Sequence, residues 1–134
     1  MKFIYHSNRK HPLISLDLKT EEYKVLPTSL KHFIHKWDYP DASVILLASD
    51  GNKLAGVFRF SFSKNGERLY ASGTWIKPRY RKEHLALKLW KKTLIKYNPT
   101  SIYVFTNSHA GHKLVSKLKK KFPDIDWDHC SDFD

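Results

Sequence analysis

Cysteine is nearly absent from this sequence, and its scarcity is typical of proteins from a reducing compartment. Cys130 is the only cysteine among 134 residues, so no disulfide can form within the chain. Stabilising disulfides are typical of secreted proteins, whereas proteins of reducing compartments do without them. The first ten residues, MKFIYHSNRK, also lack the apolar segment and the small-residue cleavage site of a signal peptide. We therefore expect a cytoplasmic protein.

Long apolar runs and glycine are also scarce. No run approaches the roughly 20 apolar residues that a membrane-spanning helix needs. The five glycines form no dinucleotide-binding fingerprint, nucleophile elbow or Walker motif. A hydrophobic fraction of 41%, with four Trp, seven Tyr and eight Phe, argues against disorder. We expect one folded domain over residues 1–134, with an acidic C-terminal end at 123–134.

Negative charge is missing from the middle of the chain. The formal net charge is +11, yet residues 53–121 hold seventeen Lys and Arg against Glu67 and Glu83, a net charge of +15. Residues 122–134 hold five Asp and no Lys or Arg. A central block of positive charge favours phosphate-rich partners such as nucleic acid, CoA or nucleotides. The alternative is a surface that is charged only for solubility.

The spacing of apolar residues predicts the order of the elements. Turn signals such as DGN and KNGE separate three strands in the middle of the chain, of which the first is continuously apolar and the second alternates. Helical segments instead show apolar residues at intervals of three and four. We expect strands over 2–7, 43–49, 53–63, 68–77, 101–107 and 124–129, and helices over 27–37, 82–97 and 110–122. This order predicts an α+β fold built on one mixed, mostly antiparallel sheet with helices on both faces.

The segment IKPRYRKEHLALKLW, residues 76–90, indicates a phosphate-binding turn. It reads as the end of a strand, a basic turn with a proline, and the start of an amphipathic helix. A helix N-terminus presents unpaired backbone N–H groups and the positive end of the helix dipole to an anion. Such turns usually contain glycine, and this one contains none. The alternative is a basic connector that binds nothing.

This turn and the element order resemble the GCN5-related N-acetyltransferase (GNAT) superfamily. The matching residues are Ile76, Pro78, Arg81, His84 and Ala86, with His84 where the family usually has its first glycine. The resemblance implies that backbone amides of the turn wrap the pyrophosphate of acetyl-CoA. A second match after the fifth strand, Asn107 with Ala110, extends the implied cofactor site. The implied cofactor-binding residues are Ile76, Arg81, Lys82, Glu83, His84, Leu85, Ala86 and Asn107.

The resemblance is incomplete at the catalytic groups. Leu114 stands where many members of the family have the tyrosine that protonates the departing thiolate. The strand at 68–77 offers no carboxylate base. We expect His109 to act as base or acid, because histidine titrates near neutral pH. Tyr103 and Tyr70 are the alternative acids. No metal is predicted, since His109, His112, His129 and Cys130 match the spacing of no standard zinc module.

The resemblance implies an N-acetyltransferase that moves an acetyl group from acetyl-CoA to an amine. The surplus lysines of helices 82–97 and 110–122 favour an acceptor that is anionic or associated with nucleic acid, either tRNA or DNA. Two alternatives stay open. AGHK at 110–113, opening a helix, is similar to phage Mom-type DNA-modification proteins. The missing glycine, carboxylate and tyrosine instead favour a non-catalytic module that binds nucleic acid or protein on the same fold.

Overall fold

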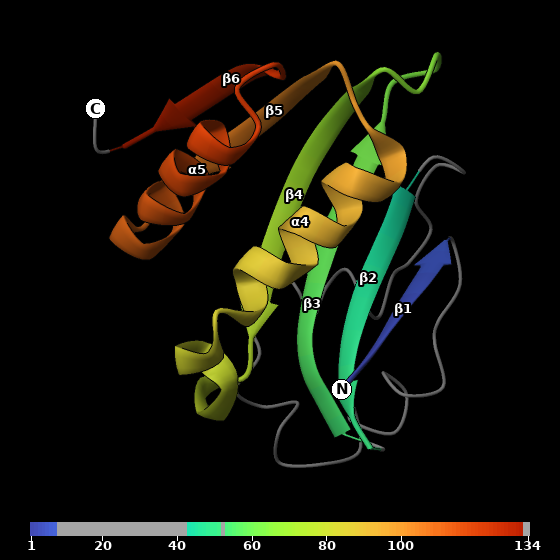
Figure 1. Cartoon of the computed structure of the whole chain (residues 1–134), viewed down its shortest axis with the longest axis vertical. Coiled ribbons are helices and arrows are strands. Elements are labelled where there is room, and N and C mark those ends of the chain that lie inside the picture. Colours follow the sequence, from blue (N-terminus) through green and yellow to red (C-terminus); the bar gives the residue numbers. More distant parts are fainter. Residues whose placement is uncertain (8–42, 52, 133–134) are drawn as a thin grey trace.

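The computed structural model describes residues 1–7, 43–51 and 53–132. Its elements are labelled as in Figure 1. The strands are β1 (Lys2–Ser7), β2 (Ser43–Asp50), β3 (Lys53–Phe62), β4 (Arg68–Ile76), β5 (Ser101–Thr106) and β6 (Asp126–Ser131). The helices are the 3₁₀-helix η1 (Pro78–Glu83), α4 (Leu85–Tyr97) and α5 (His109–Lys121). All six expected strands are therefore present, and the helix expected at 27–37 lies outside the described residues.

The six strands form one sheet in the order in which they occur along the chain. The pairs from β1 to β4 are antiparallel, and β4–β5 and β5–β6 are parallel. The mixed, mostly antiparallel sheet is thus confirmed. Helices α4 and α5 both lie in front of the sheet in Figure 1, and they share one hydrophobic core with it. The expectation of helices on both faces stays a prediction, since α4 and α5 lie on one face and residues 27–37 lie outside the described residues.

Alternation along β3 decides how α4 packs on the sheet. Phe58 and Phe60 are fully buried on the face that α4 covers. The ring of Phe58 stacks on that of Trp90 with centroids 4.5 Å apart. Trp90 Nε1 also donates a hydrogen bond of 3.2 Å to Thr74 Oγ1. The aromatic stack and this hydrogen bond hold α4 over β3 and β4.

The start of α4 differs from the expectation. The predicted helix began at residue 82, but η1 occupies Pro78–Glu83 and α4 begins at Leu85. His84 between them has φ 54° and ψ 32°, a left-handed conformation that an α-helix cannot contain. A glycine on β3 leaves room for the Ile76 side chain at the end of β4, just before this junction. A Cβ on Gly56 would lie 2.7 Å from Ile76 Cδ1 and 3.4 Å from Leu85 Cδ2.

The C-terminal part of the sheet is held by polar contacts as well as by packing. β6 lies two residues further along the chain than expected, at Asp126–Ser131. Arg68 on β4 donates to Asp128 at 2.9 Å across β5. Among the described residues, no helix is long and apolar enough to cross a membrane.

Candidate active site

A cleft opens between β4 and β5 because their pairing stops halfway. The parallel register runs from Arg68 opposite Ser101 only to Ala71 opposite Val104, while β4 continues to Ile76. At this point β4 carries one residue more than β3, since Arg59 pairs with Gly73 and Phe60 pairs with Ala71. The extra residue is Ser72. A β-bulge of this kind bends its strand and leaves backbone groups unpaired. The two strands therefore diverge beyond Ala71.

The cleft has a volume of about 850 Å³. Its walls are β4 from Ala71 to Ile76, the end of β5, the start of α4 and the first turns of α5. Small-molecule and cofactor sites in proteins commonly measure about 300–1,000 Å³. The cleft is thus large enough for an extended ligand, and one of its ends lies against a helix N-terminus.

That helix N-terminus is open. The first backbone bond of α4 runs from Lys88 N to His84 O at 3.1 Å, so the amides of Leu85, Ala86 and Leu87 have no acceptor within the helix. No side chain caps this end, and no acidic residue lies in its first turn. Such an end attracts anions, phosphate above all. Arg81 adds a guanidinium at the same wall of the cleft, where its Nε donates to Ile76 O at 2.9 Å.

The turn before α4 is anchored to the neighbouring hairpin. The Tyr80 side chain is buried, and its hydroxyl donates to Asp50 Oδ2 at 2.5 Å. The amide of Lys77 donates to Ala55 O at 2.9 Å. These two bonds tie η1 to the ends of β2 and β3. The helix N-terminus is therefore positioned by the sheet.

Replacing Tyr80 by phenylalanine is expected to lower the free energy of unfolding by about 1 kcal/mol at neutral pH. The hydrogen bond to Asp50, and then burial, raises the pKa of Tyr80 above its ordinary value of 10.0. A raised folded pKa means that this stabilisation is complete below about pH 10 and is lost as the pH rises through the folded pKa. Unfolding by urea, measured for both proteins from about pH 8 to about pH 11.5, should show their difference shrinking above about pH 10. A difference that is constant over this range would contradict the assignment.

His84 adopts the conformation that glycine adopts most easily. Its φ of 54° costs a residue with a Cβ roughly 1 kcal/mol or more, and its side chain also lines the cleft. We expect His84→Gly to raise the free energy of unfolding by about 0.5–1 kcal/mol and to tighten binding of a phosphate-bearing ligand. Asn98→Gly is the matched control, because Asn98 has φ 47° at the other end of α4. Titration calorimetry of the ligand and thermal melting, carried out on both variants, measure these changes in affinity and stability. Weaker binding by His84→Gly alone would mean that the imidazole itself contacts phosphate.

The structure gathers most of the predicted cofactor residues at the cleft. Those that line it are Ile76, Arg81, His84, Ala86 and Asn107. Lys82 and Glu83 are exposed on η1 beside the cleft, and the side chain of Leu85 is buried in the core. Of these three residues, Leu85 can therefore offer a ligand only its backbone amide.

The three candidate catalytic side chains lie around the cleft and do not line it. His109 is exposed at the first position of α5, between the lining residues Ser108 and Ala110. Tyr70 and Tyr103 are partly exposed on paired positions of β4 and β5, with ring centroids 6.4 Å apart. They therefore lie where the two strands are still paired, before the strands diverge.

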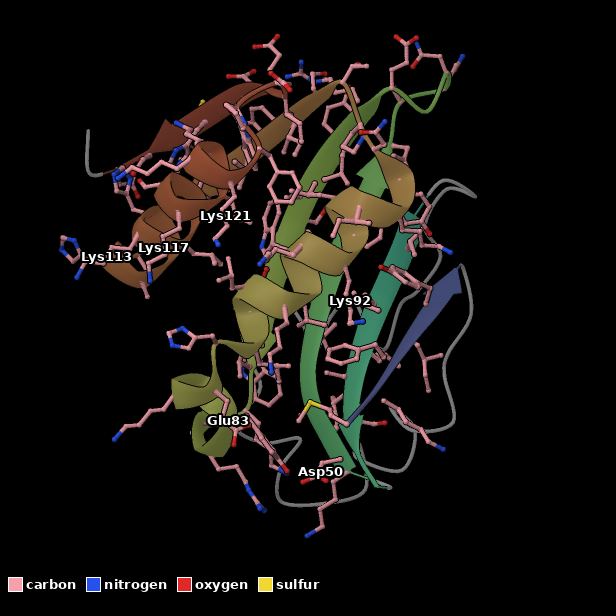
Figure 2. The ribbon with its side chains drawn as sticks, in the orientation of Figure 1. Asp50, Glu83, Lys92, Lys113, Lys117 and Lys121 are labelled. Carbon is pink, nitrogen blue, oxygen red and sulfur yellow. The ribbon has the colours of Figure 1, made fainter. Side chains whose placement is uncertain are left out.

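Several residues of the cleft were missed from the sequence. Ser72 and Thr74 line it because of the bulge, and a glycine within a strand, Gly73, was the available signal. Lys113 and Lys117 line it from α5. Figure 2 shows these two lysines and Lys121 following one another along that helix. Among the described residues that line the cleft there is no carboxylate, tyrosine or cysteine.

A histidine pair lies between α5 and β6, with one member on each element. The rings of His112 and His129 have centroids 5.2 Å apart. His129 Nε2 is 2.8 Å from Thr106 Oγ1, and His112 Nδ1 is 3.1 Å from Ser131 Oγ. In the part of the chain that the structure describes, His, Cys, Asp and Glu nowhere gather in a group of three or more that could hold a metal ion. The observed contacts join α5 to β6 and β6 to β5.

Comparison with known proteins identifies relatives of this arrangement. The sequence profile of the acetyltransferase (GNAT) family matches residues 11–118. The fold is similar to that of the ribosomal-protein-S18-alanine N-acetyltransferase from Escherichia coli, with a TM-score of 0.61 and 13% identity over 87% of this chain and 76% of that one. A predicted acetyltransferase from Clostridium acetobutylicum, solved with acetyl-CoA, has a TM-score of 0.58 and 14% identity over 87% of each chain. An aminoglycoside acetyltransferase from an uncultured soil metagenomic sample, in complex with sisomicin, has a TM-score of 0.58 and 12% identity over 89% and 85% of the two chains. No curated protein sequence matches the chain.

Proposed function

Because the chain belongs to the acetyltransferase (GNAT) family, whose members are acyltransferases that use acetyl-CoA, we propose that it acetylates an amine carried by an anionic, nucleic-acid-associated acceptor. The observation that most supports the use of acetyl-CoA is the cleft between β4 and β5, with the open N-terminus of α4 at its wall. A ligand that is anionic at one end and extended at the other fits such a cleft. Acetyl-CoA has this form.

The residues present fit the cofactor. The amides of Leu85, Ala86 and Leu87, with Arg81, would hold the pyrophosphate through hydrogen bonds and charge. The stretch of β4 from Ser72 to Ile76 has no strand paired to it on the β5 side. Its backbone N–H and C=O groups would therefore be available to the amides of the pantetheine arm. When bound, acetyl-CoA supplies an activated acetyl thioester.

The chain must then orient the acceptor amine, stabilise negative charge on the acyl oxygen and move a proton. Backbone amides freed by the bulge at Ser72 would be fixed dipoles available to that oxygen. The described lining holds no carboxylate, so we assign proton transfer to His109, which would act through water because it lies beside the cleft without lining it. Tyr103 and Tyr70 are the alternative proton donors, and they would have to act through water because they do not line the cleft.

The anionic acceptor is proposed from the charge of the two helices. Neither α4 nor α5 contains an acidic residue, and the last turn of α5 has three lysines in a row. A phosphate backbone is attracted to such a surface, and its binding releases counterions. The single cysteine, Cys130, fits a reducing compartment, and we propose the cytoplasm as the place of the reaction.

Isothermal titration with acetyl-CoA tests the proposal first. The protein is freed of nucleic acid, and free CoA and ATP serve as controls at low salt. We expect acetyl-CoA to bind at micromolar Kd and more tightly than ATP, because ATP lacks the pantetheine arm that would hydrogen-bond to the backbone of β4. Acetyl transfer to tRNA, aminoacyl-tRNA, DNA and polyamines is then followed by release of the free thiol. Equal weak binding of all polyphosphates, together with salt-dependent binding of nucleic acid, would instead identify a non-catalytic binding module.

A further inference from the structure

We propose that Lys113 and Lys117 form a second phosphate site in the cleft, one that recognises the 3′-phosphate of CoA and so selects CoA over dephospho-CoA. This inference rests on the proposed use of acetyl-CoA. It concerns the wall of the cleft formed by α5, whereas the pyrophosphate is assigned to the wall formed by α4.

The two lysines are placed as a pair. They are four residues apart on α5, which puts them on one face of the helix and about 6 Å apart along its axis. Both are exposed, and both line the cleft. Lys121 continues the same row by one further turn but is not part of the cleft lining (Figure 2).

Their charges are not compensated within the described part of the chain. No ion pair joins Lys113 or Lys117 to a described residue, and α5 itself contains no acidic side chain. In Figure 2, Glu83 lies on η1, well apart from the lysine row. Two ammonium groups that share one wall of a cleft repel each other unless an anion lies between them. A ligand with a doubly charged group removes this repulsion.

CoA carries such a group in addition to its pyrophosphate. A phosphomonoester has a charge of about −1.5 to −2 at neutral pH and three strong acceptor oxygens. Lysine binds phosphate as a compact charge with three rotatable donors, so two lysines can satisfy one phosphomonoester without a fixed geometry. The amides at the start of α4 and Arg81 already account for the pyrophosphate. Once the pyrophosphate is assigned, the 3′-phosphate is the only other anionic group of CoA. Lys113 and Lys117 are the cationic side chains among the described lining residues that have not been assigned to the pyrophosphate.

Calorimetric titration with CoA and with dephospho-CoA tests this proposal, because the two ligands differ only in the 3′-phosphate. We expect the unmodified protein to bind CoA about 30-fold more tightly, as two charge-assisted contacts allow. In the double variant Lys113→Gln with Lys117→Gln the preference should fall below about three-fold, mainly through weaker CoA binding. Lys121→Gln is the matched control from the same row, and it should keep the full preference. Raising the salt concentration should reduce the preference in the unmodified protein.

Four results would overturn the inference in distinguishable ways. Equal affinity of the unmodified protein for both ligands would mean that no site for the 3′-phosphate exists, while leaving the proposed function intact. A double variant that loses affinity for both ligands equally would place the lysines at the pyrophosphate. If Lys121→Gln loses as much preference as the double variant, the overall positive charge of α5, and not a specific site, causes the preference for CoA. If the folded protein binds neither ligand, the proposed function itself fails, and this inference fails with it.

Discussion

Replacing Ala86 by glutamate is expected to reduce acetyl-CoA affinity by about a hundred-fold while leaving the protein folded. Ala86 lies in the first turn of α4, lines the cleft, and is one of the three residues with free amides. A carboxylate there would compete for those amides and repel the pyrophosphate, which at a few ångströms costs about 3 kcal/mol in a partly exposed site. The same carboxylate complements the helix dipole, so the free energy of unfolding should stay equal or rise by about 0.5 kcal/mol.

Ala86→Gln is the matched control, because glutamine has the size of glutamate without its charge. We expect it to weaken binding by no more than about ten-fold, since it obstructs the site only sterically. Titration calorimetry gives the affinities, and thermal melting shows that both variants are folded. If both substitutions reduce affinity equally, bulk and not charge decides, and the anion site at α4 is placed wrongly. If neither reduces it, the phosphates bind elsewhere.

Replacing Phe58 by alanine is expected to cost about 3–5 kcal/mol of unfolding free energy, a large part of the stability of a domain of this size. The Phe58 side chain is fully buried between Phe60 and Trp90. Removing its ring leaves a cavity below Trp90, whose own side chain lines the cleft. The variant should therefore bind acetyl-CoA more weakly as well, because α4 is no longer held firmly against β3.

Phe62→Ala provides the control on the same strand. Phe62 is only half-buried and packs on Tyr97 at the other end of α4, with ring centroids 4.8 Å apart. Its loss should cost about 1–2 kcal/mol and leave cofactor affinity unchanged. Urea unfolding of both variants measures the loss of stability. Titration of each variant with acetyl-CoA, at a temperature where it is folded, then measures the affinity. A Phe58→Ala protein with unchanged affinity would show that the stack does not position the helix.

Local patterns in the sequence were sufficient for the elements that bury one face. The three- and four-residue spacing in α5 fits the structure, in which Val115 and Leu118 are buried, so the buried side of this helix could be assigned without knowledge of its neighbours. In β3 the alternation holds only for the stretch from Phe58 to Ser61, because residues 54–58 are all buried. The strand–turn–helix order of residues 76–90 was also predictable, and phosphate binding by its backbone stays a prediction. The exact geometry of the turn was not predictable. The left-handed conformation of His84, which delays α4 to Leu85, lies at the junction between η1 and α4.

The cleft itself was decided only by the tertiary structure. It exists because one extra residue on β4 bends that strand away from β5, and a single residue in a strand leaves little trace in a periodic pattern. The same divergence decides that Lys113 and Lys117 line a cavity while Lys121, chemically identical, does not. In the sequence the three are one row of equal charges. Side-chain chemistry and helix period are properties of the chain, whereas which of these charges meet a common ligand depends on how far apart two strands diverge.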